Sequence, residues 1–179
     1  MRAFIAIPLP DDVKDYLYNL EKEISKLPAK FRLISKKNLH LTMKFIQDAS
    51  EEQIEEIKSR LKTIKFNSIK TALKEKGLFP DEKKARIIWI DIEQESRVIE
   101  LQRKIDEKLI DLFSDNQEFK SHITLGRIKF VKNIQKFIDG MQVIKIKKIP
   151  FEINKFGLYK STLTKDGPVY ELIEEYKMN

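Results

Sequence analysis

The chain has 179 residues, of which 41% are hydrophobic and 35% are charged, a composition typical of one folded domain rather than a disordered chain. Its net charge of +7 and pI near 9.3 favour a polyanionic partner such as nucleic acid, although a basic protein without such a partner has the same composition. Cysteine is absent, which excludes disulfides and thiolate metal sites, and no apolar run is long enough to span a membrane.

The first half of the chain predicts a strand, a helix, two strands and a second helix. Residues 3–7 form an apolar run typical of a buried strand. Apolar residues at helical spacing predict a helix over residues 11–27, and residues 31–34 and 38–46 have the pattern of strands. Ser50, which is followed by glutamine three residues later, predicts a capping box at the start of the second helix.

The same order of elements then restarts. Residues 85–92 predict a strand that is apolar on both faces, and the apolar spacing over residues 98–112 predicts a long helix. A strand over residues 119–128 and a short helix ending near Gly140 follow. The order of elements therefore indicates an internal duplication.

The centre and the end of the chain differ from this repeat. The sequence Gly77-Leu78-Phe79-Pro80 is typical of a break between elements. Residues 142–160 are rich in β-forming residues, with a late strand near residues 158–161 and a final strand over 169–173. No linker separates the halves, so we expect two tightly joined lobes.

The two histidines of the chain, His40 and His122, each begin a His-x-Thr motif in an alternating apolar stretch. Six threonines are present, so chance would place one two residues after both histidines in about one chain in 900. The histidines are 122 − 40 = 82 residues apart. The same offset relates the first strand and the second helix of one half to their counterparts in the other.

Strand geometry predicts that each histidine shares a face with its threonine. Side chains alternate along a strand, so His40, Thr42 and Lys44 point one way while the apolar residues between them point to the core. His122 and Thr124 likewise share a face. If the halves pack about a pseudo-two-fold axis, these two faces meet across a cleft.

Two such imidazoles are suited to metal-free general acid–base catalysis. Two histidines supply at most two metal ligands, no acidic residue in either motif has ligand spacing, and nothing nominates an aspartate for a Ser-His-Asp triad. Imidazoles with a pKa of about 6.5 can divide the roles of proton donor and acceptor, as in-line phosphodiester cleavage requires. Thr42 and Thr124 would then hydrogen-bond the non-bridging phosphate oxygens.

The paired motifs, in this order and context, resemble those of the two-histidine phosphoesterase superfamily, and most of all the RNA 2',3'-cyclic phosphodiesterases, also called 2'-5' RNA ligases. The resemblance covers almost the whole chain, through residues 1–7, 38–45, 77–80, 86–89, 122–127, 158–161 and 167–170. It implies an α+β fold in which residues 1–179 form a single domain of two intertwined lobes. The lobes would be related by a pseudo-two-fold duplication, with antiparallel sheets lining a central cleft and helices packed on the outside.

The resemblance also implies a reaction. It is the hydrolysis of a terminal 2',3'-cyclic phosphate on RNA to a 2'-phosphomonoester, without metal or cofactor; members of the family can also join RNA ends through a 2'-5' linkage. It implies that His40 donates a proton to the 3' oxygen and that His122 is the base that activates water. Thr42 and Thr124 would bind the phosphate.

Two further residues are candidates for substrate binding. Arg127 matches the family's arginine after the second motif and would contact phosphate. Strict alternation points it away from His122, so a strand end or bulge at Gly126 must turn it. The alternative for Arg127 is a solvent-exposed charge at the end of the strand. Lys44 is the second candidate, but a solvent-exposed strand charge fits its position as well. Trp89 and Phe79 fit either base stacking at the edge of the cleft or packing in its rim.

The sequence leaves three functions open: hydrolysis at RNA ends, the same chemistry on another cyclic phosphate such as ADP-ribose cyclic phosphate, and binding of RNA ends without turnover. The expected partner is RNA with a 2',3'-cyclic phosphate end, such as a tRNA fragment, or a small nucleotide. We expect a cytoplasmic monomer with no membrane partner. Abundant lysine, glutamate and isoleucine without cysteine further indicate a thermophilic source.

Overall fold

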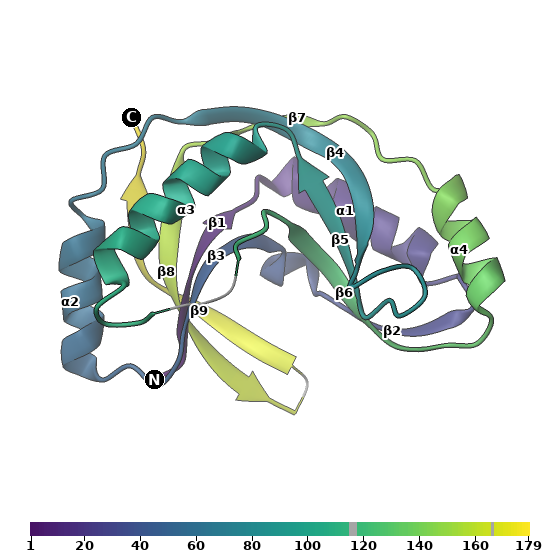
Figure 1. Cartoon of the computed structure of the whole chain (residues 1–179), viewed down its shortest axis with the longest axis horizontal. Coiled ribbons are helices and arrows are strands. Elements are labelled where there is room, and N and C mark those ends of the chain that lie inside the picture. The colour runs from purple at the N-terminus through teal and green to yellow at the C-terminus, as the bar shows by residue number, and fades with distance from the viewer. Residues whose placement is uncertain (115–117, 166) are drawn as a thin grey trace.

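A single curled sheet organises the molecule. The computed structural model describes residues 1–114, 118–165 and 167–179. Nine strands in these ranges form one antiparallel sheet, and helices lie around its outside (Figure 1). The strand order is β7-β4-β5-β6-β3-β1-β8-β9, and β2 also pairs with β6.

The elements repeat in chain order. The first series is β1 (Ala3–Pro8), α1 (Asp11–Ile24), β2 (Ala29–Leu33), the 3₁₀ helix η1 (Lys36–Asn38), β3 (His40–Ile46), α2 (Glu51–Leu61) and β4 (Ile69–Phe79). The second series is β5 (Ile87–Ile92), α3 (Glu95–Leu109), β6 (Ile123–Val131), α4 (Ile134–Val143), β7 (Pro150–Ile153), β8 (Lys155–Thr164) and β9 (Gly167–Lys177). The order β1-α1-β3-α2 thus recurs as β5-α3-β6-α4.

The two halves exchange strands. β4 belongs to the first series but pairs with β5 of the second, and β8 belongs to the second series but pairs with β1 of the first. The middle of the sheet is the contact between β3 and β6, which belong to different halves. The predicted α+β duplication with antiparallel strands and outer helices is confirmed, and the exchange explains why no linker is present.

The helices form where the apolar spacing predicted them. The inward faces of α1 and α3 are almost completely buried, with no more than 5% exposure at Val13, Leu17, Leu20, Ile24, Val98, Leu101, Ile105 and Leu109. The predicted capping box at the start of α2 is present, because the Ser50 and Gln53 side chains bond each other's backbone N–H groups. No helix in the described part of the chain is long and apolar enough to cross a membrane.

Two glycines that were expected to end elements lie inside them. Gly77 belongs to β4, a strand that the sequence pattern did not predict, and a Cβ there would lie 2.1 Å from a ring carbon of Trp89. Gly140 lies within α4, and a Cβ there would lie 2.4 Å from a methyl carbon of Leu27. Both glycines therefore mark close packing rather than a turn or a helix end.

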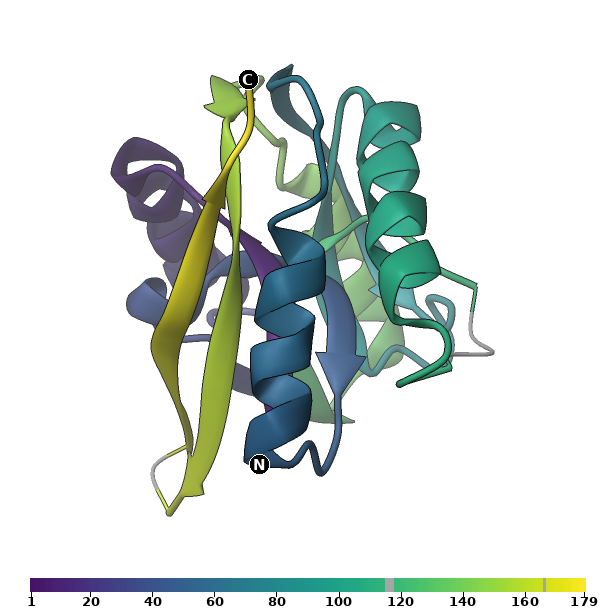
Figure 2. The ribbon, with the colours of Figure 1, turned by 90° about the vertical axis from the view of Figure 1, so that its left-hand side faces the viewer.

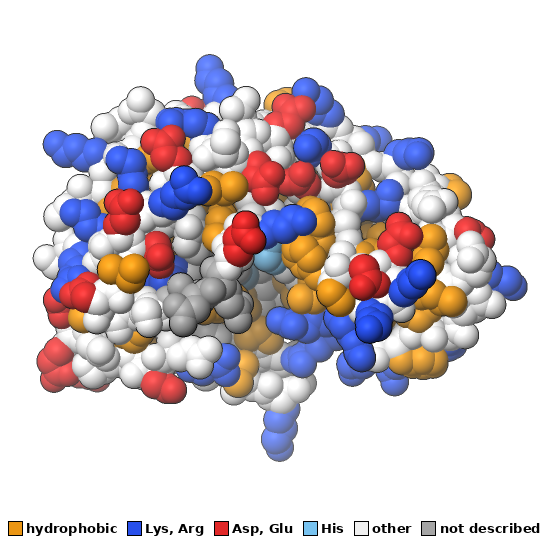
Figure 3. Space-filling view, viewed as in Figure 1, with side chains coloured by type: hydrophobic (Ala, Val, Ile, Leu, Met, Phe, Trp, Pro, Cys, Tyr) orange, Lys and Arg blue, Asp and Glu red, His pale blue; other side chains and the backbone are white. Residues whose placement is uncertain are grey.

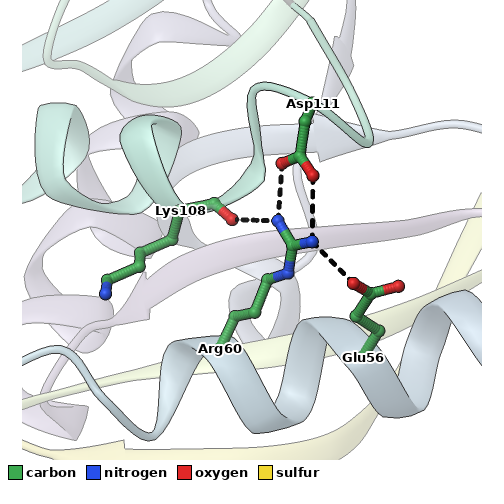
Figure 4. A network of polar contacts seen from close by, with 4 residues as sticks. All are labelled: Glu56, Arg60, Lys108 and Asp111. Carbon is green, nitrogen blue, oxygen red and sulfur yellow. Dashed lines mark hydrogen bonds and ion pairs between the residues drawn. The ribbon is translucent and has the colours of Figure 1, made fainter.

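α2 and α3, which come from different halves, lie side by side on one flank of the molecule (Figure 2). Arg60 of α2 joins them: it donates to the Lys108 carbonyl oxygen (2.8 Å), to both carboxylate oxygens of Asp111 (2.5 and 2.9 Å) and to Glu56 (2.6 Å) (Figure 4). This contact fastens the outer layer of one half to that of the other.

Candidate active site

The strands that carry the two histidines are neighbours at the middle of the sheet. Leu41 of β3 pairs with Ile123 of β6, and both side chains are buried on the core face. Because the strands are antiparallel, this register places His40 beside Thr124 and His122 beside the threonine of β3 on the opposite face. A histidine side chain is visible in a hollow near the middle of the molecular surface, with hydrophobic, basic and acidic side chains around it (Figure 3).

One backbone carbonyl fixes the tautomer of His40. Its Nδ1 lies 2.6 Å from the Asn38 carbonyl oxygen, and because a carbonyl only accepts, Nδ1 carries a hydrogen and donates it. The Nε2 atom lies 2.8 Å from Oγ1 of Thr42. The hydroxyl therefore donates to Nε2 when the ring is neutral, and the protonated Nε2 donates to the hydroxyl.

His122 is held in the same way. Its Nδ1 donates to the carbonyl oxygen of Lys120 at 2.7 Å, again two residues upstream of the histidine. Both rings thus use Nδ1 for orientation and leave Nε2 as the atom that can exchange a proton.

Both imidazoles favour the neutral form. Burial lowers the pKa of His40, and the charges of Lys14 and His122 lower it further, against the opposing effect of the Asn38 carbonyl. Burial also lowers the pKa of His122, with a further contribution from the Lys120 charge against the effect of the Lys120 carbonyl. A bound phosphate anion would oppose these effects by stabilising an imidazolium.

Aromatic rings form a wall around each histidine. The ring of His40 lies 5.0 Å from that of Phe4 and 5.5 Å from that of Tyr170, centroid to centroid. Tyr170 belongs to the β8–β9 hairpin, which extends from the sheet (Figure 1) and is tied to the first half by a 2.9 Å hydrogen bond from Asn38 Nδ2 to the Pro168 carbonyl oxygen. The hairpin thereby covers one side of His40.

The wall around His122 consists of Phe79 and Trp89. Their rings stack on each other at 4.9 Å, and they lie 5.2 and 6.4 Å from the His122 ring. The amino group of Lys120 lies 4.8 Å from the Trp89 ring centre. Trp89 is only 8% exposed, and Phe79 is half-buried with Trp89 stacked on it, so these two rings pack in the rim of the cleft rather than offering an open stacking face.

A bulge follows the first motif and moves Lys44 to the other face. In the ladder with β1, Ala6 pairs with Thr42 but Ile5 pairs with Lys44, which leaves Met43 as an extra residue. The Lys44 side chain is 1% exposed and its amino group pairs with Asp106 of α3. The prediction that Lys44 shares the face of His40 is therefore wrong, because strict alternation does not allow for the bulge.

The second motif has a bulge at the corresponding position, since 125 − 43 = 82. Trp89 pairs with Thr124 but Ile88 pairs with Gly126, so the extra residue is Leu125. Arg127 then pairs with Ile87, on the face that holds Trp89 and Thr124. The predicted turn of Arg127 toward the cleft is present, with the bulge one residue earlier than Gly126.

Burial raises the pKa of Tyr170, and the charge of Arg127 opposes this shift, as expected for a cation near the hairpin.

Sequence reasoning missed Phe45, Asn38 and Tyr170. Phe45 follows the first bulge and is the counterpart of Arg127, since 127 − 45 = 82; its side chain is 65% exposed on the Phe4 side of the sheet. The repeat offset could have identified it. No local pattern indicates Asn38 or Tyr170, because the segments that meet are far apart in the sequence. Asn38 and Pro168, which the hydrogen bond joins, are separated by 130 residues.

Comparisons with known proteins agree with the repeat and with the geometry. The family model described as LigT-like phosphoesterase matches the chain twice, over residues 7–89 and 90–170, and each match contains one His-x-Thr motif. A protein of Methanocaldococcus jannaschii named RNA 2',3'-cyclic phosphodiesterase is 36% identical over 178 residues, 98% of this chain and 100% of that protein. A protein of the same name from Thermotoga maritima is 30% identical and covers 98% of this chain and 94% of that protein. The solved structure of E. coli LigT complexed with 3'-AMP shares the fold, with a TM-score of 0.78 and 22% identity over 99% of this chain and 97% of that one.

Proposed function

This chain belongs to the LigT-like phosphoesterase family, and we propose that it hydrolyses the 2',3'-cyclic phosphate at the end of an RNA chain to a 2'-phosphomonoester. The observation that carries the proposal is the pair of His-x-Thr faces that meet where β3 pairs with β6. The relatives of M. jannaschii and T. maritima are named for this activity, which supports the choice of substrate.

The proposed reaction uses each histidine once. Nε2 of neutral His122 takes a proton from water as the water oxygen bonds to phosphorus. The bond from phosphorus to the 3' oxygen breaks on the opposite side, and protonated His40 gives its Nε2 proton to that oxygen. The product carries a 2'-phosphate and a 3'-hydroxyl. A 5'-hydroxyl in the place of water would form a 2'-5' linkage by the same two proton transfers.

The remaining side chains bind the substrate. Thr42 and Thr124 hydrogen-bond the non-bridging oxygens, and Arg127, which the bulge at Leu125 turns toward the cleft, supplies the positive charge for the phosphate. The exposed ring of Phe45 offers a stacking face to the terminal base. Lys44 takes no part, because its amino group is buried against Asp106.

The test is product analysis on an RNA oligonucleotide that ends in a 2',3'-cyclic phosphate. We expect the native protein to release a 2'-phosphate end in the presence of EDTA, and His40→Ala and His122→Ala each to reduce the rate at least about 100-fold while the circular dichroism spectrum is unchanged. Arg127→Lys, which keeps the charge but loses the paired donors, should retain more activity than Arg127→Ala. Full activity in either histidine variant, or a 3'-phosphate product, would refute the proposal.

A further inference from the structure

A pocket of about 160 Å³ lies beside His40, which is one of its lining residues. The rings of Phe4, Tyr159 and Tyr170 line it, and so do Lys14 of α1 and Lys37 of η1. His122 does not line this pocket. The pocket therefore belongs to one half of the site.

The chemistry proposed above determines which part of the substrate reaches this side. Water and the 3' oxygen occupy opposite sides of phosphorus in an in-line reaction. Since His40 protonates the 3' oxygen, the ribose lies on the His40 side. The 5' oxygen of the same nucleotide is joined to that ribose through C4' and C5', so any phosphate on it lies on the His40 side as well.

The charges on this side fit a phosphate. Neighbouring Lys36 pairs with Asp15, but within the described residues neither Lys14 nor Lys37 has a carboxylate oxygen within 4.0 Å of its amino group. Lys14 is half-buried and close enough to His40 for its charge to act on the imidazole. An anion held between the two lysines would gain from both charges.

We propose that Lys14 and Lys37 form a subsite for the 5' phosphate of the terminal nucleotide. This proposal rests on the proposed function and refines it. The enzyme then distinguishes the end of an RNA chain, whose last nucleotide carries a 5' phosphodiester, from a nucleoside 2',3'-cyclic phosphate, which has no 5' phosphate. Because the subsite reads phosphate rather than base, the preference holds for any terminal base.

The experiment compares kcat/KM for three substrates: adenosine 2',3'-cyclic phosphate, the same compound with a 5' monophosphate, and the dinucleotide ApA with a terminal 2',3'-cyclic phosphate. We expect the two compounds with a 5' phosphate to exceed the first by about tenfold or more at low salt, with a smaller ratio at high salt. A preference for the dinucleotide over the 5' monophosphate identifies the phosphodiester of a chain as the natural ligand. The reverse order identifies a small nucleotide.

Variants test whether Lys14 and Lys37 cause the preference for a 5' phosphate. In the double variant Lys14→Gln, Lys37→Gln we expect the ratio of kcat/KM with and without a 5' phosphate to fall to nearly one. Lys37→Glu should reverse the preference. The matched control is Lys104→Gln, an exposed lysine on α3 that does not line the pocket, which should keep the native ratio. Equal rates on all three substrates, or an unchanged ratio in the double variant, would overturn the subsite while the proposed hydrolysis stands. Absence of hydrolysis of all three would overturn both.

Discussion

Replacing Gly77 by alanine should damage the His122 half of the site through Trp89. The added Cβ would lie 2.1, 2.3 and 2.8 Å from three ring carbons, whereas ordinary contacts begin at 3.4 Å. To restore an ordinary contact at the nearest carbon, the ring and the strand must separate by about 3.4 − 2.1 = 1.3 Å. The ring packs on Phe79 at 4.9 Å and lies 6.4 Å from His122, so we expect its displacement to disturb the packing of both neighbours.

The size of this shift sets the expected loss of stability and the expected loss of rate. Overpacking of a closed site costs about 1–3 kcal/mol of unfolding free energy, and a displacement of about 1 Å at a catalytic group can reduce the rate by about 100-fold. Urea unfolding measures the first quantity, and hydrolysis of the RNA 2',3'-cyclic phosphate measures the second.

Gly140→Ala is the matched control. Its Cβ would lie 2.4 Å from a methyl group of Leu27, the end of a flexible side chain, and alanine is favoured over glycine inside a helix by about 1 kcal/mol. This variant should keep both stability and rate within a narrow margin. If Gly77→Ala hydrolyses the substrate as fast as Gly140→Ala does, the packing of Trp89 does not position His122 and the reasoning is wrong.

Two further predictions concern pH. Trp89 is the only tryptophan and lies beside His122, so its fluorescence should fall as the imidazole is protonated. The midpoint should lie below pH 6.5 because burial lowers the pKa of His122. His122→Ala should remove the transition, and a midpoint above pH 6.5 would contradict the assignment. Glu21 is 2% exposed, and burial raises its pKa from 4.5 to about 8, so the unfolded chain loses this proton first and stability falls between pH 4.5 and 8. The upper limit of this loss in the free energy of unfolding is about 5 kcal/mol, and we expect roughly half. Urea unfolding at pH 5, 6.5, 8 and 9 measures the dependence of stability on pH, which Glu21→Gln should make weaker. An equal dependence in both proteins would refute the assignment.

The sequence predicts the features that depend on local periodicity and on the repeat. Strand alternation identifies the faces of His40 and His122, and the 82-residue offset identifies the duplicated order of elements. Both are properties of neighbouring residues or of two copies of the same pattern, so they are visible in the sequence.

Features set by pairing between distant strands could not be predicted. The extra residue in each ladder depends on the partner strand, which is why strict alternation places Lys44 on the wrong face and does not single out Phe45. The glycine that allows Trp89 to pack has the sequence pattern of a break between elements, so the pattern does not predict β4. The contact of Tyr170 with His40 depends on the hydrogen bond between Asn38 and the hairpin, which no local pattern encodes.

The paired bulges have a consequence for how a substrate can enter the cleft. The backbone of one half repeats that of the other, from the carbonyl that holds Nδ1 to the extra residue after the threonine. A cleft with this symmetry would accept a cyclic phosphate in either of two opposite orientations. The side chains that emerge beyond the bulges differ, however: one is the apolar ring of Phe45 and the other is the cation of Arg127. In the proposed reaction the duplication supplies a matched acid and base, and the divergence of these two positions would give the cleft a polarity, so that the chain end would enter one way round.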